Sequence, residues 1–135
     1  DIGKIVLAAN QSKTYPTVLN MVKSQQIQLW EAERLVFCVD HADVGGYLLG
    51  LWGLPVPVVE AVAMHHAPGR APAQPFSPLT AVHLANAIAS EGHFAPANYP
   101  PSAIDADYVE RLGLSTKFQQ WREELPSGLD NSRDA

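Results

Sequence analysis

The chain has 135 residues, of which 47% are hydrophobic and 17% charged, and its formal net charge is −5. This balance indicates one folded domain with a substantial core rather than a disordered chain. The negative charge and the lack of basic runs argue against nucleic acid or an anionic membrane as partner. No apolar stretch approaches the roughly 20 residues that a membrane span needs.

The single cysteine, Cys38, excludes an intrachain disulfide and a multi-cysteine metal site. It lies in the apolar stretch 35–39, so we interpret it as a small buried core residue. Reducing, cytoplasmic surroundings fit this cysteine usage best. The chain opens on Asp1 and passes at once into apolar periodicity. We therefore expect that the N-terminal part of a domain is missing.

Helical signals dominate from the first residues onward, and strand signals are almost absent. Residues 2–9 resemble the end of one helix. Thr14 is placed to cap a second helix, with Pro16 in its first turn. A third helical segment covers 29–36, and its amphipathic surface is formed by Trp30, Glu33, Arg34 and Phe37.

The most regular part of the chain is 40–66, which predicts two helices. Asp40 is a good N-cap, and Asp43 can bond back to its amide. Gly53-Leu54-Pro55 ends the first helix, and the second runs to His66. The connection is so short that the two helices must be antiparallel neighbours. Gly45-Gly46 inside the first helix indicates close packing of a neighbouring helix.

The remaining segments predict short helices separated by proline-rich loops. A loop at 67–76 precedes a helix that starts at Ser77-Pro78, and further helices are capped by Asp105 or Asp107 and by Ser115. Residues 126–135 form a polar tail that we expect to be disordered. The prediction is an all-α bundle of about six to seven helices in a domain covering 1–125.

Six polar residues are candidates for metal binding or catalysis: Asp1, His41, His65, His66, His83 and Asn86. His41 opens one helix of the antiparallel pair, and His65-His66 close the other, so the three imidazoles are expected to converge at one end of the bundle. Imidazole with carboxylate suits Fe, Mn or Zn. The alternative is structural: histidines at helix ends also favour the helix dipole, and adjacent residues on a helix point about 100° apart.

Several segments of the sequence resemble a known family. Asp1-Ile2-Gly3-Lys4 is similar to the end of the His-Asp-Ile-Gly signature of HD-superfamily phosphohydrolases. Residues 40–49, 52–55 and 59–66, and less specifically 81–86, resemble the HDOD (HD-related output domain) family. The likeness covers roughly 1–90 and implies an HD-domain-like helical bundle and a bacterial signal-transduction role. In catalytic relatives, the HD-GYP phosphodiesterases, the matching positions Asp1, His41, His65, His66 and Asn86 would be metal ligands.

The sequence departs from the catalytic pattern at named positions. Asn86 is neutral where an acidic ligand is expected, and Ala67-Pro68-Gly69 stands in place of the substrate loop. The resemblance therefore implies a regulatory output domain that acts through protein–protein or interdomain contacts without catalytic residues. The alternative is a metal-dependent phosphohydrolase acting on nucleotides or cyclic di-GMP.

The same resemblance sets the expectations for ligands and partners. We expect no cofactor, with a divalent metal at Asp1, His41, His65 and His66 as the alternative. The expected partners are other signalling domains or proteins, or a second copy in a homodimer. A nucleotide that binds without being hydrolysed is a third hypothesis.

Overall fold

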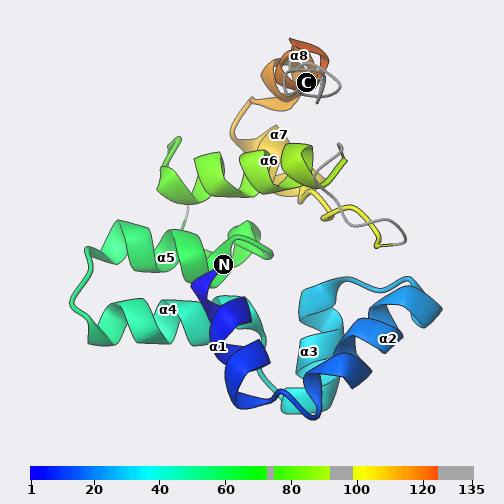
Figure 1. Cartoon of the computed structure of the whole chain (residues 1–135). Helices are drawn as coiled ribbons and strands as arrows, with labels where there is room; N and C mark the ends of the chain where they lie inside the picture. Colours follow the sequence, from blue (N-terminus) through cyan, green and yellow to red (C-terminus); the bar gives the residue numbers. More distant parts are fainter. Residues whose placement is uncertain (73–74, 92–98, 125–135) are drawn as a thin grey trace, which may run out of the picture.

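A computed structural model describes residues 1–72, 75–91 and 99–124. Within these ranges the chain is all-helical, with eight α-helices and no strand, close to the six or seven helices predicted (Figure 1). In chain order the helices are α1 (Ile2–Asn10), α2 (Tyr15–Gln25), α3 (Leu29–Phe37), α4 (His41–Leu51), α5 (Val56–Met64), α6 (Pro78–Glu91), α7 (Ala106–Arg111) and α8 (Ser115–Glu124).

Helices α1, α4, α5 and α6 form the central part of the molecule, with α4 and α5 antiparallel as predicted (Figure 1). Glycines allow close contact between them. A Cβ added at Gly3 would lie 1.9 Å from the carbonyl oxygen of His41, and one at Gly46 would lie 2.6 Å from the Cβ of Ala63. The prediction that Gly46 marks close packing of a neighbouring helix is confirmed. This packing brings the start of α1 against the start of α4.

The start of α4 is fixed by its own sequence. The carboxylate of Asp40 accepts from the amide of Asp43 at 2.9 Å, and the Asp43 carboxylate faces the Asp40 amide in return. This is the predicted capping box. Arg34 adds a bond of 2.6 Å to Asp40. The first residue of α4, His41, is thereby held in a defined place.

Helices α2 and α3 pack as a hairpin beside α1 and α4. Val18, Val22 and Ala32 are fully buried between them. Tyr15 stacks on Phe37, with ring centroids 6.2 Å apart. The hairpin carries Glu33, a fully buried carboxylate on α3, toward the start of α4.

The last three helices share a second apolar core. Its buried members come from α6, α7 and α8 and are Leu84, Ala87, Tyr108, Val109 and Phe118. Asp105 caps α7 by accepting from the amide of Tyr108 at 2.9 Å, which decides between the two predicted caps. Helix α6 begins at Pro78, as expected after Ser77.

Three local predictions were wrong. Cys38 is exposed, because α3 ends there with a left-handed residue (φ 63°) instead of continuing into the core. Thr14 precedes α2 but makes no side-chain capping bond. The loop at 67–76 contains a 3₁₀ turn, Pro68–Arg70, because proline fits the first position of such a turn.

The predicted polar tail, 126–135, lies outside the described residues. Among the helices that the structure describes, none is both long enough and apolar enough to cross a bilayer.

Candidate metal centre

His41 is held by two bonds from one carboxylate. Glu33 Oε2 accepts from the backbone amide of His41 at 2.9 Å and lies 2.5 Å from its Nδ1. Because an ionised carboxylate only accepts, Nδ1 carries the hydrogen of this bond. The Nε2 atom of His41 therefore points to the other side of the ring, toward the end of α5.

His65 and His66 lie at the end of α5 rather than inside it. The helix ends at Met64, with His65 as its C-cap. His65 still has right-handed helical dihedrals, φ −64° and ψ −18°, yet the rings of His65 and His66 lie close together. Their centroids are 3.9 Å apart. The Nδ1 of His65 donates to the carbonyl of Val62 at 2.7 Å. The lone pair of this ring is therefore on Nε2, where it could bind a metal.

The three imidazoles converge, as the antiparallel pair of helices predicts. One nitrogen from each of His41, His65 and His66 lies within 4.8 Å of the other two. The Nε2 atoms of His41 and His66 are 2.8 Å apart. Two nitrogens bound to one metal at about 2.1 Å lie roughly 3 Å apart at a right angle. In this structure the two rings form a hydrogen bond, and their nitrogens are as close as two neighbouring ligands on one ion.

Asp1 supplies the carboxylate closest to these rings. Its Oδ1 lies 3.7 Å from Nε2 of His41 and 3.9 Å from Nε2 of His65. Its Oδ2 bonds to the ammonium of Lys4 at 2.9 Å. The Asp1 side chain is 52% exposed, so it lies at the mouth of the cluster.

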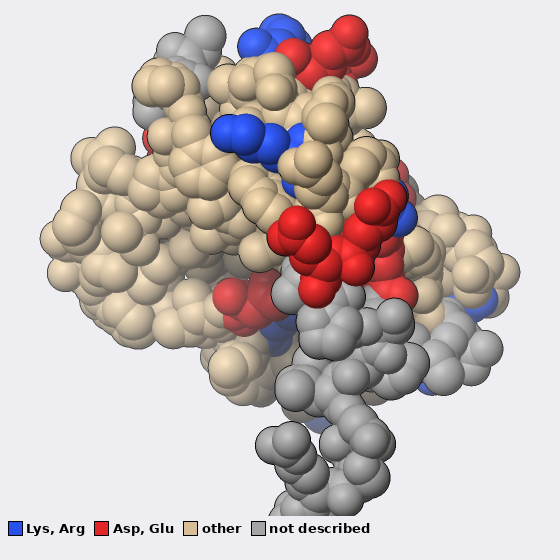
Figure 2. All heavy atoms as spheres, turned by 90° about the horizontal axis from the view of Figure 1, so that it is seen from above, with Lys and Arg blue, Asp and Glu red and all other residues tan. Residues whose placement is uncertain are grey.

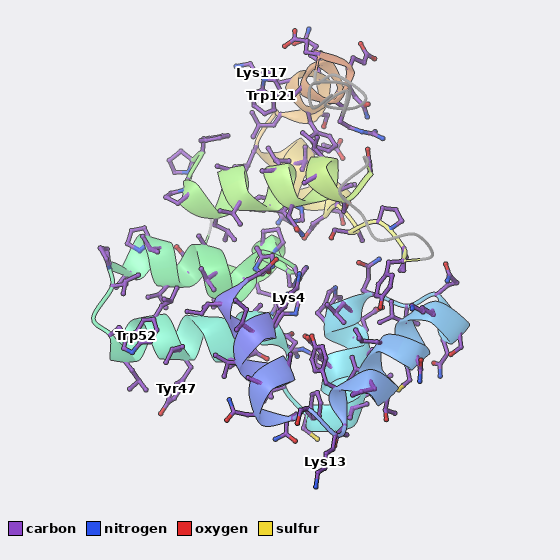
Figure 3. All side chains as sticks on the ribbon, viewed as in Figure 1. Lys4, Lys13, Tyr47, Trp52, Lys117 and Trp121 are labelled. Atoms are coloured by element: carbon purple, nitrogen blue, oxygen red, sulfur yellow. The ribbon has the colours of Figure 1, made fainter. Side chains whose placement is uncertain are left out.

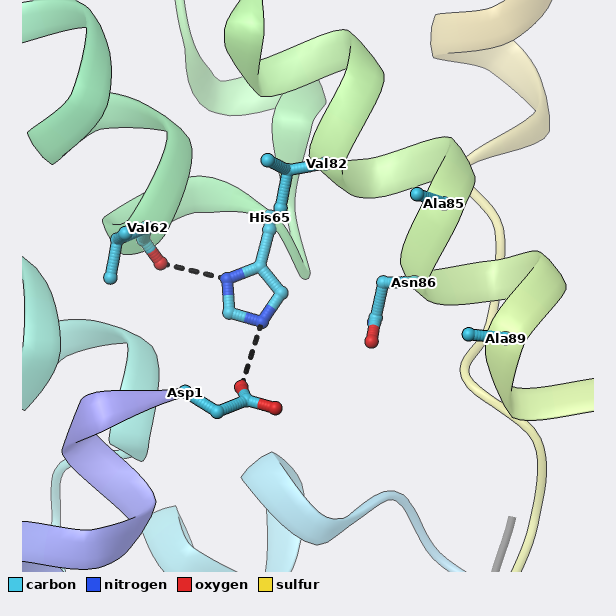
Figure 4. A pocket seen from close by; sticks show the side chains of 7 residues that line it. All are labelled: Asp1, Val62, His65, Val82, Ala85, Asn86 and Ala89. Carbon is cyan, nitrogen blue, oxygen red and sulfur yellow. Dashed lines mark hydrogen bonds and ion pairs between the residues drawn. The ribbon is translucent and has the colours of Figure 1, made fainter. Parts of the chain in front are cut away.

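A pocket of about 340 Å³ opens beside Asp1 and His65 (Figure 4). Its lining is largely apolar and comes from α5 and α6, with Asn86 as the polar residue on the α6 side. Figure 4 shows Asn86 across the pocket from His65 and Asp1. Asn86 thus faces the cluster with a neutral amide, at the position where the family resemblance predicts an acidic ligand.

Burial keeps two of the three imidazoles, His65 and His66, neutral. Burial lowers the pKa of His65 to about 4, and the nearby His41 adds to this, against the bond to Val62. Burial lowers the pKa of His66 to about 2, with His65 and His41 contributing. Both rings are therefore neutral at pH 7. A neutral imidazole is the form that binds a metal ion.

His83 does not join the cluster. Its Nδ1 donates to the backbone carbonyl of His65 at 2.7 Å, and its Nε2 accepts from the amide of Asp105 at 3.0 Å. Both ring nitrogens are thus used by backbone groups. His83 is fully buried and supports the turn that carries His65.

Sequence reasoning missed two residues of this site. Glu33 was placed on an amphipathic surface, whereas it is buried against His41. Trp30 stacks on His66 with ring centroids 5.9 Å apart. Both lie on α3, which directly precedes α4 in the chain, and nothing in the sequence of this amphipathic helix set either residue apart.

The donor set fits one divalent ion better than two. Three imidazole nitrogens and one carboxylate match the ligands that Fe, Mn and Zn accept. His41, His65, His66 and Asp1 would hold the ion, which would act as a Lewis acid on a bound oxygen. The Glu33 carboxylate is occupied by His41 and Tyr15. Among the described residues around the cluster, Asp1 is the carboxylate left for a metal.

The described part of the chain is an all-α bundle with three histidines gathered at helix ends. The HDOD domain model matches residues 1–68, half of the chain, so the chain belongs to the HDOD domain family. The match covers α1 to α5 and ends before α6, which is shorter than the likeness expected to about residue 90. Searches of curated proteins and of solved structures gave no significant match.

Proposed function

We propose that this chain is a regulatory domain of bacterial signal transduction that works through contacts with other domains or proteins, without catalysis. The observation that carries the proposal is the charge of the cluster. The oxygens of Glu33 are taken up by His41 and Tyr15, so among the described residues Asp1 is the carboxylate left beside the three imidazoles, and Asn86 across the pocket is neutral. A two-metal clamp on a phosphodiester needs ligands that neutralise two cations, and this cluster offers too few carboxylates.

The proposed contacts have a suitable surface at the turn between α4 and α5. No charged residue occurs from Val44 to Val59. The large apolar side chains of this turn are exposed: Tyr47, Leu51, Trp52 and Val56. Tyr47 and Trp52 point away from the bundle in Figure 3, and the left edge of the molecule in Figure 2, where the α4–α5 turn lies, shows no Lys, Arg, Asp or Glu. Contiguous apolar surface of this kind is typical of an interaction site.

We further propose that His41, His65 and His66 bind one divalent metal, with Asp1 as a fourth ligand. The convergence of the three rings supports this proposal. The Nδ1–H bonds of His41 and His65 support it as well, because they leave the lone pair of each ring on Nε2. In a non-catalytic domain such an ion would stabilise the junction of α1, α4 and α5.

Elemental analysis and a hydrolysis assay on cyclic di-GMP test both parts together. We expect at most one metal per chain and no turnover. Two metal equivalents, with turnover that disappears in His41→Ala, would overturn the regulatory proposal in favour of a phosphohydrolase. Heat on calorimetric titration with cyclic di-GMP, without turnover, would replace it by a nucleotide sensor.

Trp30 gives a local measurement of metal binding. Its ring stacks on His66, so Cu²⁺ or Co²⁺ in the cluster should quench its fluorescence. In a Trp52→Phe/Trp121→Phe background the signal comes from Trp30 alone. We expect saturable quenching that is lost in His41→Ala and in His66→Ala. Equal quenching in these variants would show that the metal binds elsewhere and would overturn the metal proposal.

A further inference from the structure

Glu33 is a buried carboxylate whose hydrogen bonds go to His41 of the histidine cluster and to Tyr15 on the neighbouring helix α2. Its side chain is 0% exposed. Oε2 receives the amide and Nδ1 hydrogens of His41, at 2.9 and 2.5 Å. Oε1 receives the hydroxyl hydrogen of Tyr15 at 2.8 Å. Three donors thus surround a group that touches none of the solvent.

Burying a carboxylate is costly unless hydrogen bonds or charges compensate for the lost water. An apolar side chain at position 33 would avoid this cost within the α3 face. The need to pair the first amide of α4 does not explain a buried carboxylate either, because that amide is only one of the three donors that Glu33 accepts from. The bond to the imidazole Nδ1 is the contact that acts on the cluster.

We propose that Glu33 is a positioning residue for the metal centre: it holds His41 in the Nδ1–H tautomer and so directs the lone pair of Nε2 toward His65 and His66. The role rests on the metal site proposed above. A carboxylate behind a histidine ligand also makes the ligating nitrogen more basic. Tyr15 fixes the second oxygen of Glu33, so the α2–α3 hairpin contributes to the site without supplying a ligand.

Glu33→Gln removes the charge while keeping the size and the acceptor oxygen. We expect the affinity for Zn²⁺, measured by calorimetry, to fall about 10- to 100-fold, the usual effect of losing such a partner. Glu31→Gln is the matched control. Glu31 lies on the same helix and caps its start by accepting from the amide of Gln28 at 2.9 Å. The control should weaken α3 but change the affinity for Zn²⁺ less than twofold.

Nitrogen-15 NMR of the imidazoles in the metal-free protein at pH 8 reads the tautomer directly. We expect His41 to be protonated on Nδ1 in the wild type and in Glu31→Gln, and to lose this preference in Glu33→Gln. Protonation of His41 on Nε2 in the wild type would overturn the role of Glu33, even if the Glu33 variant does not fold. An unchanged tautomer and affinity in folded Glu33→Gln would do the same.

The two measurements separate this inference from the function on which it rests. If the wild type binds no Zn²⁺, the metal proposal fails and the positioning role fails with it, whatever the tautomer. If the wild type binds Zn²⁺ but His41 shows the other tautomer, the metal site stands and only the role of Glu33 is overturned.

Discussion

At the scale of single residues, buried neutral histidines set how the protein responds to acid. Burial lowers the pKa of His65 to about 4 and that of His66 to about 2, and it also lowers the pKa of His83. The ordinary value for histidine is about 6.5. The unfolded chain therefore binds more protons than the folded chain between these values. The stability that the neutral rings contribute is complete above pH 6.5 and is lost as the pH falls toward 4.

We predict that the free energy of unfolding of the metal-free protein falls between pH 6.5 and 5. The limiting slope is about 1.4 kcal/mol per pH unit for each such histidine. Urea unfolding at pH 7.5, 6.5, 5.8 and 5 measures it. His65→Gln should give a shallower slope because one titrating group is gone. A free energy of unfolding that is constant across this range would contradict the assignment of buried neutral rings.

The sequence predicted the convergence of the three histidines but not the carboxylate behind His41. The convergence of His41 with His65 and His66 follows from a short connection between two antiparallel helices, which is a local property. The contact between Glu33 and His41 depends on how the α2–α3 hairpin packs against α4, and no spacing along the chain encodes that packing. An acidic residue on a half-apolar helix is usually solvated, so its burial was not predictable.

At the scale of the helix, α4 and α5 approach each other through a glycine. A Cβ at Gly46 would lie 2.6 Å from the Cβ of Ala63, closer than side-chain carbons pack, whereas a Cβ at Gly50 would meet only Val59 at 3.9 Å. Both glycines lie in α4, so their helix propensities are equal. The pair therefore separates the effect of interhelical packing from that of the backbone.

We predict opposite effects for the two alanine substitutions. Gly46→Ala should destabilise the protein by about 1–3 kcal/mol, because overpacking outweighs the gain in helix propensity. Gly50→Ala should stabilise it by about 0.5–1 kcal/mol, because alanine favours the helix and meets no obstacle. Thermal unfolding followed by circular dichroism measures both. Equal stabilisation by the two would mean that α4 and α5 are not in close contact at Gly46.

The helix boundaries were predictable where a side chain makes the bond that defines them. Asp40 and Asp43 form the expected capping box, and Asp105 caps α7. The end of α3 at Cys38 was not predictable, because a left-handed residue other than glycine leaves no sequence signal. Without that signal, the apolar run around Cys38 suggested that the helix continues and that Cys38 is buried.

At the scale of the whole molecule, His83 joins the family-matched part of the chain to the helices that follow. It bonds the carbonyl of His65, at the end of α5, and the amide of Asp105, at the start of α7. The family match ends at residue 68, so α6 to α8 lie beyond it. One buried ring thereby connects the C-terminal core to the turn that carries the histidine pair.

We predict that His83→Ala destabilises the protein by about 2–5 kcal/mol, because two buried backbone groups lose their partners. Val82→Ala, a change to the half-exposed neighbouring side chain, should cost less than about 1 kcal/mol. Urea unfolding of both variants gives the comparison. Similar small losses would show that α7 is held to the histidine turn by its apolar core alone.

The sequence by itself determined the all-α class, the antiparallel pair α4–α5, its caps and the end of the bundle at which three histidines meet. These features depend on residues close together in the chain, where periodicity, capping and short connections act. Only the tertiary structure decided that Glu33 is buried behind His41, that His83 serves two backbone groups and that Asn86 faces Asp1 across a pocket. Those contacts depend on how separate helices pack against one another, which local propensity does not specify.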